Sequence, residues 1–526
     1  MQLLASLVLL AILKARSASA AVREYTLDVV NAPVAPDGFT RSAPTLVLTP
    51  MPSFPGPVLT ANKGDTFKVT FNNKLTDGSM RLSTAIDFDG LLSETSSIYD
   101  EGSPFVTQCP FGPGTSYTYG HGDQTGTSWY HSSLSLQYAD GLRGAVVIYD
   151  PEDPLAHLYD VDNESTIITV GDWWHNTSVS GLISYNATQI IPVQDSGLVN
   201  GKGRFVNGPE VPYAVTTVKT GTRYRFRVIN ISARSDIAFS IDNHTMTIIE
   251  ADGTETVPME VNLIDIMPGQ RYSVIVTANQ AVGNYWINAF PDGGNLAFNL
   301  GFNPLLSRGI LRYVGAPAVE PTAPMTGGPT GAAANELQEH LLTPLIAMAA
   351  PEPDFILSFQ TSMPVGETIW LLNGTQYQPP VVPTLVKILD GASQPIDFNK
   401  TENTFIFPQN KTVEINFLPD PTNELHPFHL HGNRFFVVKS NESDIINTVN
   451  PIRRDVSAKG NGGTILRFTT EKPGPWFFHC HIFWHFWAGL GSVMVASPEG
   501  TRQQVHPDKA WDDLCPAYNA LPVDQQ

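Results

Sequence analysis

Short runs rich in Val, Ile, Thr and Phe recur along the whole chain and are separated by Gly, Pro and Asn turns. Examples of these runs are Thr66–Asn72, Gly144–Tyr149, Thr222–Ile231 and Arg271–Thr277. Such residues favour pleated, half-buried strands, and long amphipathic helical patterns are nearly absent. The sequence therefore predicts an all-β protein built from sandwiches or barrels in series.

The chain has 526 residues, which exceeds what one hydrophobic core usually organises, so two or three domains are expected. One break in composition, from Gly315 to Ala334, is rich in Pro, Ala and Gly and is typical of a linker. A softer boundary lies near Pro151 to Pro154. We predict domains at 21–150, 151–315 and 340–526, with a linker at 316–339.

The N-terminus resembles a secretory signal, because an apolar run from Leu3 to Leu13 precedes small residues that end at Ala20. This run is too short to span a bilayer, and no other segment predicts a membrane span. We therefore expect cleavage after residue 20 and an extracellular location. Nine Asn-x-Ser/Thr sequons fit a glycosylated secreted protein: Asn163, Asn176, Asn186, Asn230, Asn243, Asn373, Asn399, Asn410 and Asn441.

Without the signal the chain carries 29 basic and 50 acidic residues, because residues 1–20 hold Lys14, Arg16 and no acid. This balance argues against nucleic acid as a partner. Three cysteines are present, Cys109, Cys480 and Cys515. In an oxidising compartment an odd number leaves one thiol for chemistry.

Two histidine clusters in the last domain surround one of these cysteines. The first reads His426-Pro-Phe-His429-Leu-His431, and the second is His479-Cys480-His481 followed by His485. A thiolate with two imidazoles is the ligand set of a trigonal blue-copper site, which Cys480, His426 and His485 would supply. Leu490, ten residues after the cysteine, takes the expected axial position, where a hydrocarbon favours a high reduction potential.

The remaining imidazoles of the two clusters have the spacing of a second metal centre. Side chains alternate along a strand, so His479 and His481 point away from the thiolate between them while staying covalently linked to it. The same period puts His429 and His431 on one face. These four imidazoles are therefore expected to gather behind the first site and to hold further metal.

Along nearly its whole mature length the chain resembles fungal laccases, which are multicopper oxidases. The resemblance is carried by Gln108–Pro110, Trp129–Ser132, Gln137–Gly144, Gly201–Phe205, Gly269–Val274 and Gly474–His485. It implies three consecutive cupredoxin-like Greek-key domains, one type 1 copper in the third, and a three-copper cluster between the first and third. It further implies that phenols or aromatic amines lose electrons at the type 1 copper and that dioxygen accepts them. Lignin degradation is the process that the resemblance suggests.

The same resemblance assigns roles to individual residues. It implies that His429 is a type 2 copper ligand, that Cys480 passes electrons to the cluster, and that Asp100 relays protons. Cys109 would pair with Cys515. The type 3 copper ligands would be His131, His431, His479 and His481.

The sequence departs from the family at the three-copper cluster. Laccases carry His-Trp-His-Gly where this chain reads Asp87-Phe88-Asp89-Gly90, and their His-Ser-His motif has become His131-Ser132-Ser133. The type 2 position therefore holds Asp87, and two type 3 positions hold Asp89 and Ser133. Carboxylates prefer harder cations than imidazoles do, and a hydroxyl is a poor copper ligand.

These observations lead to three hypotheses for function. The first is a secreted laccase-type oxidoreductase with one type 1 copper, up to four coppers if the altered cluster still loads, and impaired activity. The second is a non-catalytic or electron-transfer cupredoxin with type 1 copper only, as an accessory partner of active laccases. The third is a secreted glycoprotein that kept the fold without copper. The natural substrate, oligomeric state and biological role stay open.

Overall fold

The computed structural model describes residues 20–48, 52–92, 95–122, 124–188, 190–292, 299, 301–323, 335–364, 367–419 and 424–526. The predicted signal peptide lies outside these residues, except for Ala20. So does the middle of the predicted linker, residues 324–334. Within the described residues, no helix is both long and apolar enough to cross a membrane.

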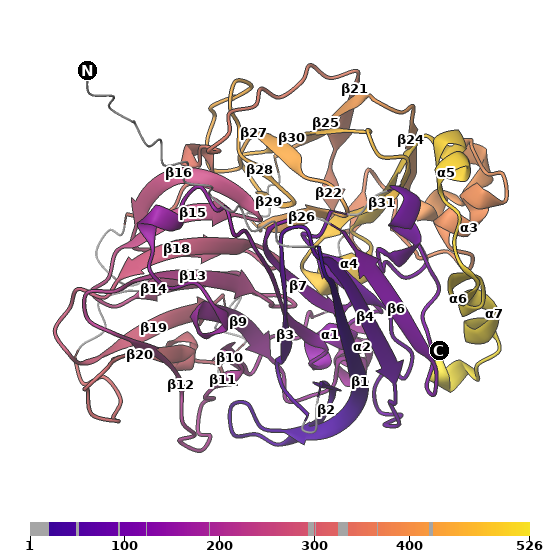
Figure 1. Ribbon diagram of the computed structural model, residues 1–526. Coiled ribbons are helices and arrows are strands. Elements are labelled where there is room, and N and C mark those ends of the chain that lie inside the picture. Colours follow the sequence, from indigo (N-terminus) through magenta and orange to yellow (C-terminus); the bar gives the residue numbers. More distant parts are fainter. Residues whose placement is uncertain are drawn as a thin grey trace, which may run out of the picture.

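Strands form three consecutive groups of sheets, which we call the first, second and third units (Figure 1). The first unit, drawn from indigo to purple, pairs its strands in the orders β2-β1-β4-β6 and β3-β8-β7-β5. Its strands are β1 (Val22–Val34), β2 (Arg41–Val47), β3 (Gly56–Asn62), β4 (Thr66–Asn73), β5 (Ile86–Asp89), β6 (Ser116–His121), β7 (Gly126–Ser132) and β8 (Arg143–Tyr149).

The second unit, drawn in magenta, has the sheet orders β11-β10-β9-β13-β18-β15-β16 and β12-β20-β19-β14-β17. Its strands are β9 (Ile167–Trp173), β10 (Ser196–Val199), β11 (Lys202–Gly203), β12 (Ala214–Val218), β13 (Arg223–Asn230), β14 (Ile237–Ile241), β15 (Met246–Ala251), β16 (Thr254–Val261), β17 (Ile264–Ile266), β18 (Arg271–Thr277), β19 (Asn284–Pro291) and β20 (Arg308–Tyr313).

The third unit, drawn from orange to yellow, has the orders β21-β25-β30-β27-β28 and β24-β32-β31-β26-β29, with the small pair β22-β23. Its strands are β21 (Phe355–Phe359), β22 (Thr361–Ser362), β23 (Leu371–Leu372), β24 (Thr404–Phe407), β25 (Thr412–Phe417), β26 (His426–Leu430), β27 (Phe435–Lys439), β28 (Arg453–Arg454), β29 (Val456–Lys459), β30 (Thr464–Thr469), β31 (Gly474–Cys480) and β32 (Gly491–Ala496).

The three units repeat one architecture. Each has two main sheets, and each main sheet contains a parallel pair: β1/β4 and β3/β8, then β9/β13 and β12/β20, then β21/β25 and β24/β32. The four strands predicted from sequence appear as β4, β8, β13 and β18. The predicted all-β class, with consecutive β-sandwich units, is confirmed.

Helices are short and lie between strands or at the C-terminus. The α-helices are α1 (Gln137–Asp140), α2 (Ser178–Thr188), α3 (Thr384–Leu389), α4 (Phe483–Ala488), α5 (Pro498–Gln504), α6 (Lys509–Asp512) and α7 (Leu514–Asn519). Short 3₁₀ segments are η1 (Thr95–Asp100), η2 (Ala156–Leu158), η3 (Glu164–Thr166), η4 (Pro304–Leu306), η5 (Glu339–Leu341), η6 (Pro395–Asp397), η7 (Lys400–Glu402) and η8 (Val523–Gln525).

The segment before the third unit is bonded to the second. Glu336 forms a bridge with Leu263, and Pro344 forms one with Thr256 in β16. The predicted boundary at residue 340 therefore falls inside a stretch that runs along the second unit. The domain limits remain predictions.

All three units meet at one buried arginine. Arg271, from β18 of the second unit, donates from Nε to the Thr127 carbonyl of the first unit at 3.0 Å. Its two terminal nitrogens donate to the carboxylate of Asp455 in the third unit at 2.6 and 2.9 Å. This contact joins the first and third units, and nearby Asp89 of β5 contacts His429 of β26 and His481, which directly follows β31.

Candidate metal centre

Three of the predicted ligands converge in the third unit. His426 begins β26, Cys480 ends β31, and His485 lies in α4, the helix that follows β31. Cys480 Sγ lies 3.8 Å from Nδ1 of His426 and 4.0 Å from Nδ1 of His485. The two Nδ1 atoms are 3.2 Å apart. Three soft or borderline donor atoms therefore face one point.

These donors fit one copper ion. An ion about 2.0–2.3 Å from each atom in a trigonal plane would place neighbouring ligand atoms about 3.5–4.0 Å apart, close to the separations found here. All three side chains are buried, and burial raises the pKa of the Cys480 thiol, so without a metal the sulfur stays protonated. Metal binding would release that proton.

The walls of this site are apolar. The Leu490 side chain is fully buried, and its carbonyl accepts a hydrogen bond from the Cys480 backbone N–H at 3.1 Å. Trp370 packs edge-on against the His426 ring and at a tilt against His485, with centroids 4.7 and 5.2 Å apart. Apolar surroundings of this kind favour the reduced, less charged form of a bound copper.

Glu424 borders the site on its outer side. Its Oε1 lies 3.3 Å from Nε2 of His485, and its side chain is 40% exposed. Burial acts to raise the pKa of Glu424. The hydrogen bond from His485 and the charges of His485, His426 and Arg234 outweigh that effect and lower the pKa to about 2. Glu424 lies only two residues before the first histidine cluster in the sequence, but its contact with His485 was not predicted.

A second cluster lies between the first and third units and is centred on Asp89. Asp89 Oδ2 lies 2.6 Å from Nε2 of His481 and 3.4 Å from Nε2 of His131. Asp89 Oδ1 lies 3.2 Å from Nε2 of His429. All four side chains are buried. The carboxylate of Asp89 therefore occupies the space between three imidazoles.

The charge of Asp89 follows from these neighbours. Burial opposes ionisation, but His429, His131 and His481 together hold the pKa of Asp89 well below its usual value. Burial likewise acts to lower the pKa of His429, and the charge and hydrogen bond of Asp89 raise it to about 9. Asp89 and His429 thus form a buried ion pair.

Asp87 belongs to a separate group. Its Oδ2 lies 3.4 Å from Nδ1 of His431, which also hydrogen-bonds Glu101 and contacts Ser103 Oγ at 3.0 Å. His431 Nε2 lies 2.9 Å from Nε2 of His479. Burial, followed by the charges of Glu101 and Asp89, raises the pKa of Asp87 well above normal, so this acid is protonated. Asp87 and Asp89 both stand where the family has histidine, but they therefore differ in charge.

Ser133 and Asp100 make hydrogen bonds to other side chains. Ser133 donates from Oγ to Asp87 Oδ2 at 3.2 Å. Asp100 accepts a hydrogen bond from Tyr117 at 2.7 Å instead of contacting an imidazole. The acid that contacts an imidazole here is its neighbour Glu101, which pairs with His431, and the proton-relay role of Asp100 stays a prediction. The contact of Glu101 with His431 was not predicted from the sequence.

The second cluster does not fit three copper ions. Five imidazoles are gathered there, from His131, His429, His431, His479 and His481, where the family pattern needs eight. The Asp89 carboxylate lies among three of them. Asp87, Glu101 and His431 hydrogen-bond or contact one another and Ser133. The donor set is therefore mixed and anionic.

One disulfide links the C-terminal segment to the first unit. Cys109 is bonded to Cys515 of α7, 406 residues further along the chain. Trp511 donates from Nε1 to the Thr107 carbonyl at 3.0 Å. Figure 1 shows α6 and α7, in yellow, beside the purple strands of the first unit. Among the described residues, Cys480 is the free cysteine, and it is buried.

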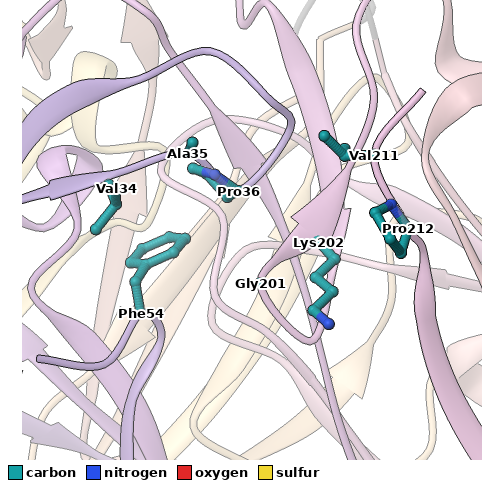
Figure 2. Close-up of a pocket in the computed structure, with 8 residues that line it drawn as sticks. All are labelled: Val34, Ala35, Pro36, Phe54, Gly201, Lys202, Val211 and Pro212. Atoms are coloured by element: carbon teal, nitrogen blue, oxygen red, sulfur yellow. The ribbon is translucent and has the colours of Figure 1, made fainter. Parts of the chain in front are cut away.

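Two cavities have different relations to these clusters. A cavity of about 460 Å³ between the first and third units reaches Ser133 and is lined by Phe105, Tyr377, Phe486 and Tyr518. A second, of about 400 Å³, lies between the first and second units (Figure 2). Figure 2 shows Phe54 and Lys202 at this second cavity, whose lining includes none of the predicted ligands.

Comparisons with known proteins agree with this geometry. Sequence profiles described as "Multicopper oxidase" match residues 35–153, 164–316 and 377–500. The chain is 46% identical to Laccase-2 of Agaricus bisporus, with 96% of each chain covered. It is 42% identical to Laccase-4 of Trametes villosa, covering 96% of this chain and 95% of the relative.

Solved structures give the same result for the fold. The crystal structure of a laccase from Botrytis aclada superposes with a TM-score of 0.81 at 32% identity, covering 95% of this chain and 93% of that one. Its three cupredoxin-like domains correspond to the three units described above. The chain therefore belongs to the multicopper oxidase family, within which it is a member of the fungal laccases.

Proposed function

We propose that this protein is a secreted, laccase-type copper protein that takes electrons from small aromatic reductants at His426, Cys480 and His485 and reduces dioxygen poorly. The observation that carries the proposal is the convergence of one sulfur and two Nδ1 atoms, 3.2–4.0 Å apart, in a buried apolar site. Copper bound there supplies one-electron redox chemistry.

The residues around His485 suit phenols and aromatic amines. His485 Nε2 lies at the outer edge of the site, beside the half-exposed carboxylate of Glu424. An ionised Glu424 would accept a hydrogen bond from a phenolic hydroxyl held against that edge, and would take its proton as the phenol loses an electron, because that loss makes the hydroxyl strongly acidic. On the inner side, the peptide bonds of Cys480 lead directly to His479 and His481, which face the second cluster.

Poor oxygen reduction is proposed from the second cluster. Asp87, Asp89 and Ser133 take the places of three imidazoles, and Asp89 is paired with a cationic His429. The contacts of Asp89 with three imidazoles favour a second candidate function, a one-electron carrier without oxidase activity. Oxygen uptake distinguishes the two candidates.

Secretion and glycosylation are supported by the N-terminal sequence and by the sequons. Eight of the nine sequon asparagines are exposed or half-buried. Asn230 is buried and donates from its side-chain nitrogen to the carbonyls of Ser235 and Ile266, so this sequon is not expected to carry a glycan.

The test is to load the full chain with copper and to measure its copper content, blue absorption, electron paramagnetic resonance and oxygen uptake with a phenol. We expect an intense blue colour that one electron from the phenol bleaches, and slow reoxidation by air. Cys480→Ser should abolish the colour. Copper-loaded protein that is colourless and gives no electron paramagnetic resonance signal would refute the proposal.

A matched variant tests the cause of slow oxygen reduction. The triple variant Asp87→His, Asp89→His, Ser133→His restores the family's imidazoles at the three positions. We expect its oxygen uptake to rise at least about tenfold, the scale on which ligand changes act at metal sites. An unchanged rate, in folded and copper-loaded protein, would show that the lost ligands are not the cause.

A further inference from the structure

We propose that Asp89, His131 and His481 form a site for one divalent transition-metal ion of the zinc or iron(II) class, which cross-links the first and third units. One ligand atom from each residue lies within 4.8 Å of the others, and all three side chains are buried. This site would use part of the altered cluster in place of three copper ions, and it does not require the type 1 site.

The distances between the ligand atoms suit a single ion. Asp89 Oδ2 lies 2.6 Å from Nε2 of His481 and 3.4 Å from Nε2 of His131. Ligand atoms around an ion at about 2.1 Å are about 3.0–3.4 Å apart in octahedral or tetrahedral geometry. The two separations from Asp89 lie below and at the upper end of that range, and all three ligand atoms lie within 4.8 Å of one another, so small movements of side chains would complete the site.

One ligand atom has no other partner among the described residues. Nε2 of His131 is buried and makes no hydrogen bond, although it faces Asp89. The opposite nitrogen, Nδ1, is held by the Ser132 carbonyl at 3.1 Å, which fixes the orientation of the ring. A buried imidazole nitrogen without a hydrogen bond costs free energy, and a metal ion would satisfy it.

The carboxylate is oriented by residues behind it. Asp89 Oδ1 is paired with Nε2 of His429, and Nδ1 of that ring lies 3.0 Å from the Asp455 carbonyl. The Asp455 side chain is in turn bound by Arg271. Metal sites in proteins depend on such outer contacts, which set the direction of each ligand.

The chemistry of the donors indicates the class of ion. Two imidazoles and one carboxylate are typical of non-haem iron(II) and also suit zinc, whereas three coppers need many more imidazoles. The carboxylate brings negative charge into a dry site, where it offsets the charge of a divalent ion. The cavity of about 460 Å³ reaches Ser133, two residues after His131, and its lining includes none of the three proposed ligands.

The position of the site predicts a structural role. Asp89 ends β5 and His131 lies in β7, both in the first unit, whereas His481 follows β31 in the third. An ion bound to all three would join the units without contributing electrons. Because it would bind the folded protein alone, it would raise the unfolding temperature as its concentration increases.

The experiment uses the full chain with Cys480→Ser, which removes the thiolate of the type 1 ligand set, and titrates it with Zn²⁺ alone. We expect one zinc per chain by elemental analysis after dialysis, and an unfolding temperature that rises with zinc. Adding Asp89→Asn should abolish both. Adding Asp87→Asn, which changes the neighbouring acid in the same way, should leave both intact.

Several results would overturn the proposal. These are folded Cys480→Ser protein that binds no zinc, zinc binding that survives Asp89→Asn, or loss of binding in Asp87→Asn as well as Asp89→Asn. Three coppers per chain in the same background would also overturn it. If Asp89→Asn fails to fold by circular dichroism, His131→Gln replaces it, with the same expectation. The type 1 proposal is tested separately by blue absorption in protein that keeps Cys480.

Discussion

At the scale of single residues, environment decides what a substitution does. Asp87 and Asp89 stand two residues apart on β5, and both occupy positions where the family has histidine. Asp89 meets three imidazoles and is ionised, whereas Asp87 meets Glu101 and is protonated. One carboxylate therefore acts as an anion that pairs with His429, and the other as a neutral hydrogen-bonding group.

Asp100 gives a prediction for the pH dependence of stability. Burial raises its pKa to about 7 from an ordinary value of 3.8, with the charge of Asp508 adding to the effect against the Tyr117 hydrogen bond. The folded protein therefore keeps a proton that the unfolded chain has lost. The resulting cost in stability is absent below about pH 4, grows as the pH rises, and is complete above about pH 7.

Asp100→Asn should remove this cost. The difference in unfolding free energy between the variant and the parent is expected to increase by about 1–2 kcal/mol from pH 5 to pH 8, in favour of the variant, after allowance for partial solvent exposure. Chemical denaturation at both pH values measures the change. The exposed Asp524→Asn serves as the control and should show no such gain. If Asp100→Asn and the parent differed in stability by the same amount at pH 5 and pH 8, the raised pKa of Asp100 would be contradicted.

At the scale of elements, the turn between α4 and β32 holds the type 1 ligands in place. Gly489 ends α4 with φ of +128°, and its N–H donates to the carbonyls of His485 and Phe486. A Cβ at this position would lie 2.4 Å from the backbone oxygen of Trp370, which packs against both imidazoles. Only glycine therefore fits here without moving the wall of the site.

Gly489→Ala should weaken copper binding at the type 1 site about tenfold, because the displaced Trp370 and His485 disturb the ligand geometry. Competition with a copper chelator, followed by blue absorption, measures this. Gly391→Ala is a matched control, since that glycine has φ of +116° but a Cβ added there would meet no atom within 4 Å. Equal losses in both variants would point to backbone strain alone.

At the scale of the whole molecule, Arg271 holds the three units together. It is fully buried, it bonds the first unit through the Thr127 carbonyl, and it binds Asp455 in the third. Breaking a buried ion pair on one side leaves an uncompensated charge, which usually costs about 3–5 kcal/mol.

Arg271→Met should therefore lower the unfolding temperature and weaken the contact between the first and third units. The double variant Arg271→Met, Asp455→Leu should unfold at a higher temperature than the single variant, because the carboxylate that lost Arg271 as its partner is then removed as well. Calorimetry of all three proteins tests this. A double variant that is less stable than Arg271→Met would contradict the explanation.

The C-terminus contributes to the same assembly. The Cys109–Cys515 bond closes a loop of hundreds of residues, and Trp511 packs its indole N–H against the first unit. Cross-links that close long loops reduce the entropy of the unfolded chain. The last helices therefore act as a strap from the third unit to the first.

Much of this protein could be predicted from its sequence. Alternating Val, Ile, Thr and Phe runs indicated the all-β class, because side-chain period and β-propensity are local properties. The spacing of His426, Cys480 and His485 indicated the type 1 ligand set for a similar reason, since the motifs are short and their donors lie on two neighbouring strands and the helix that follows one of them.

Only the tertiary structure decided the state of the second cluster. Asp89 contacts His429 and His481 across the interface between the first and third units. His481 lies nearly four hundred residues after Asp89 in the sequence. The same contact brings Glu101 instead of Asp100 to His431. Charge and pairing in a buried site depend on distance and desolvation, which no local pattern in the sequence carries.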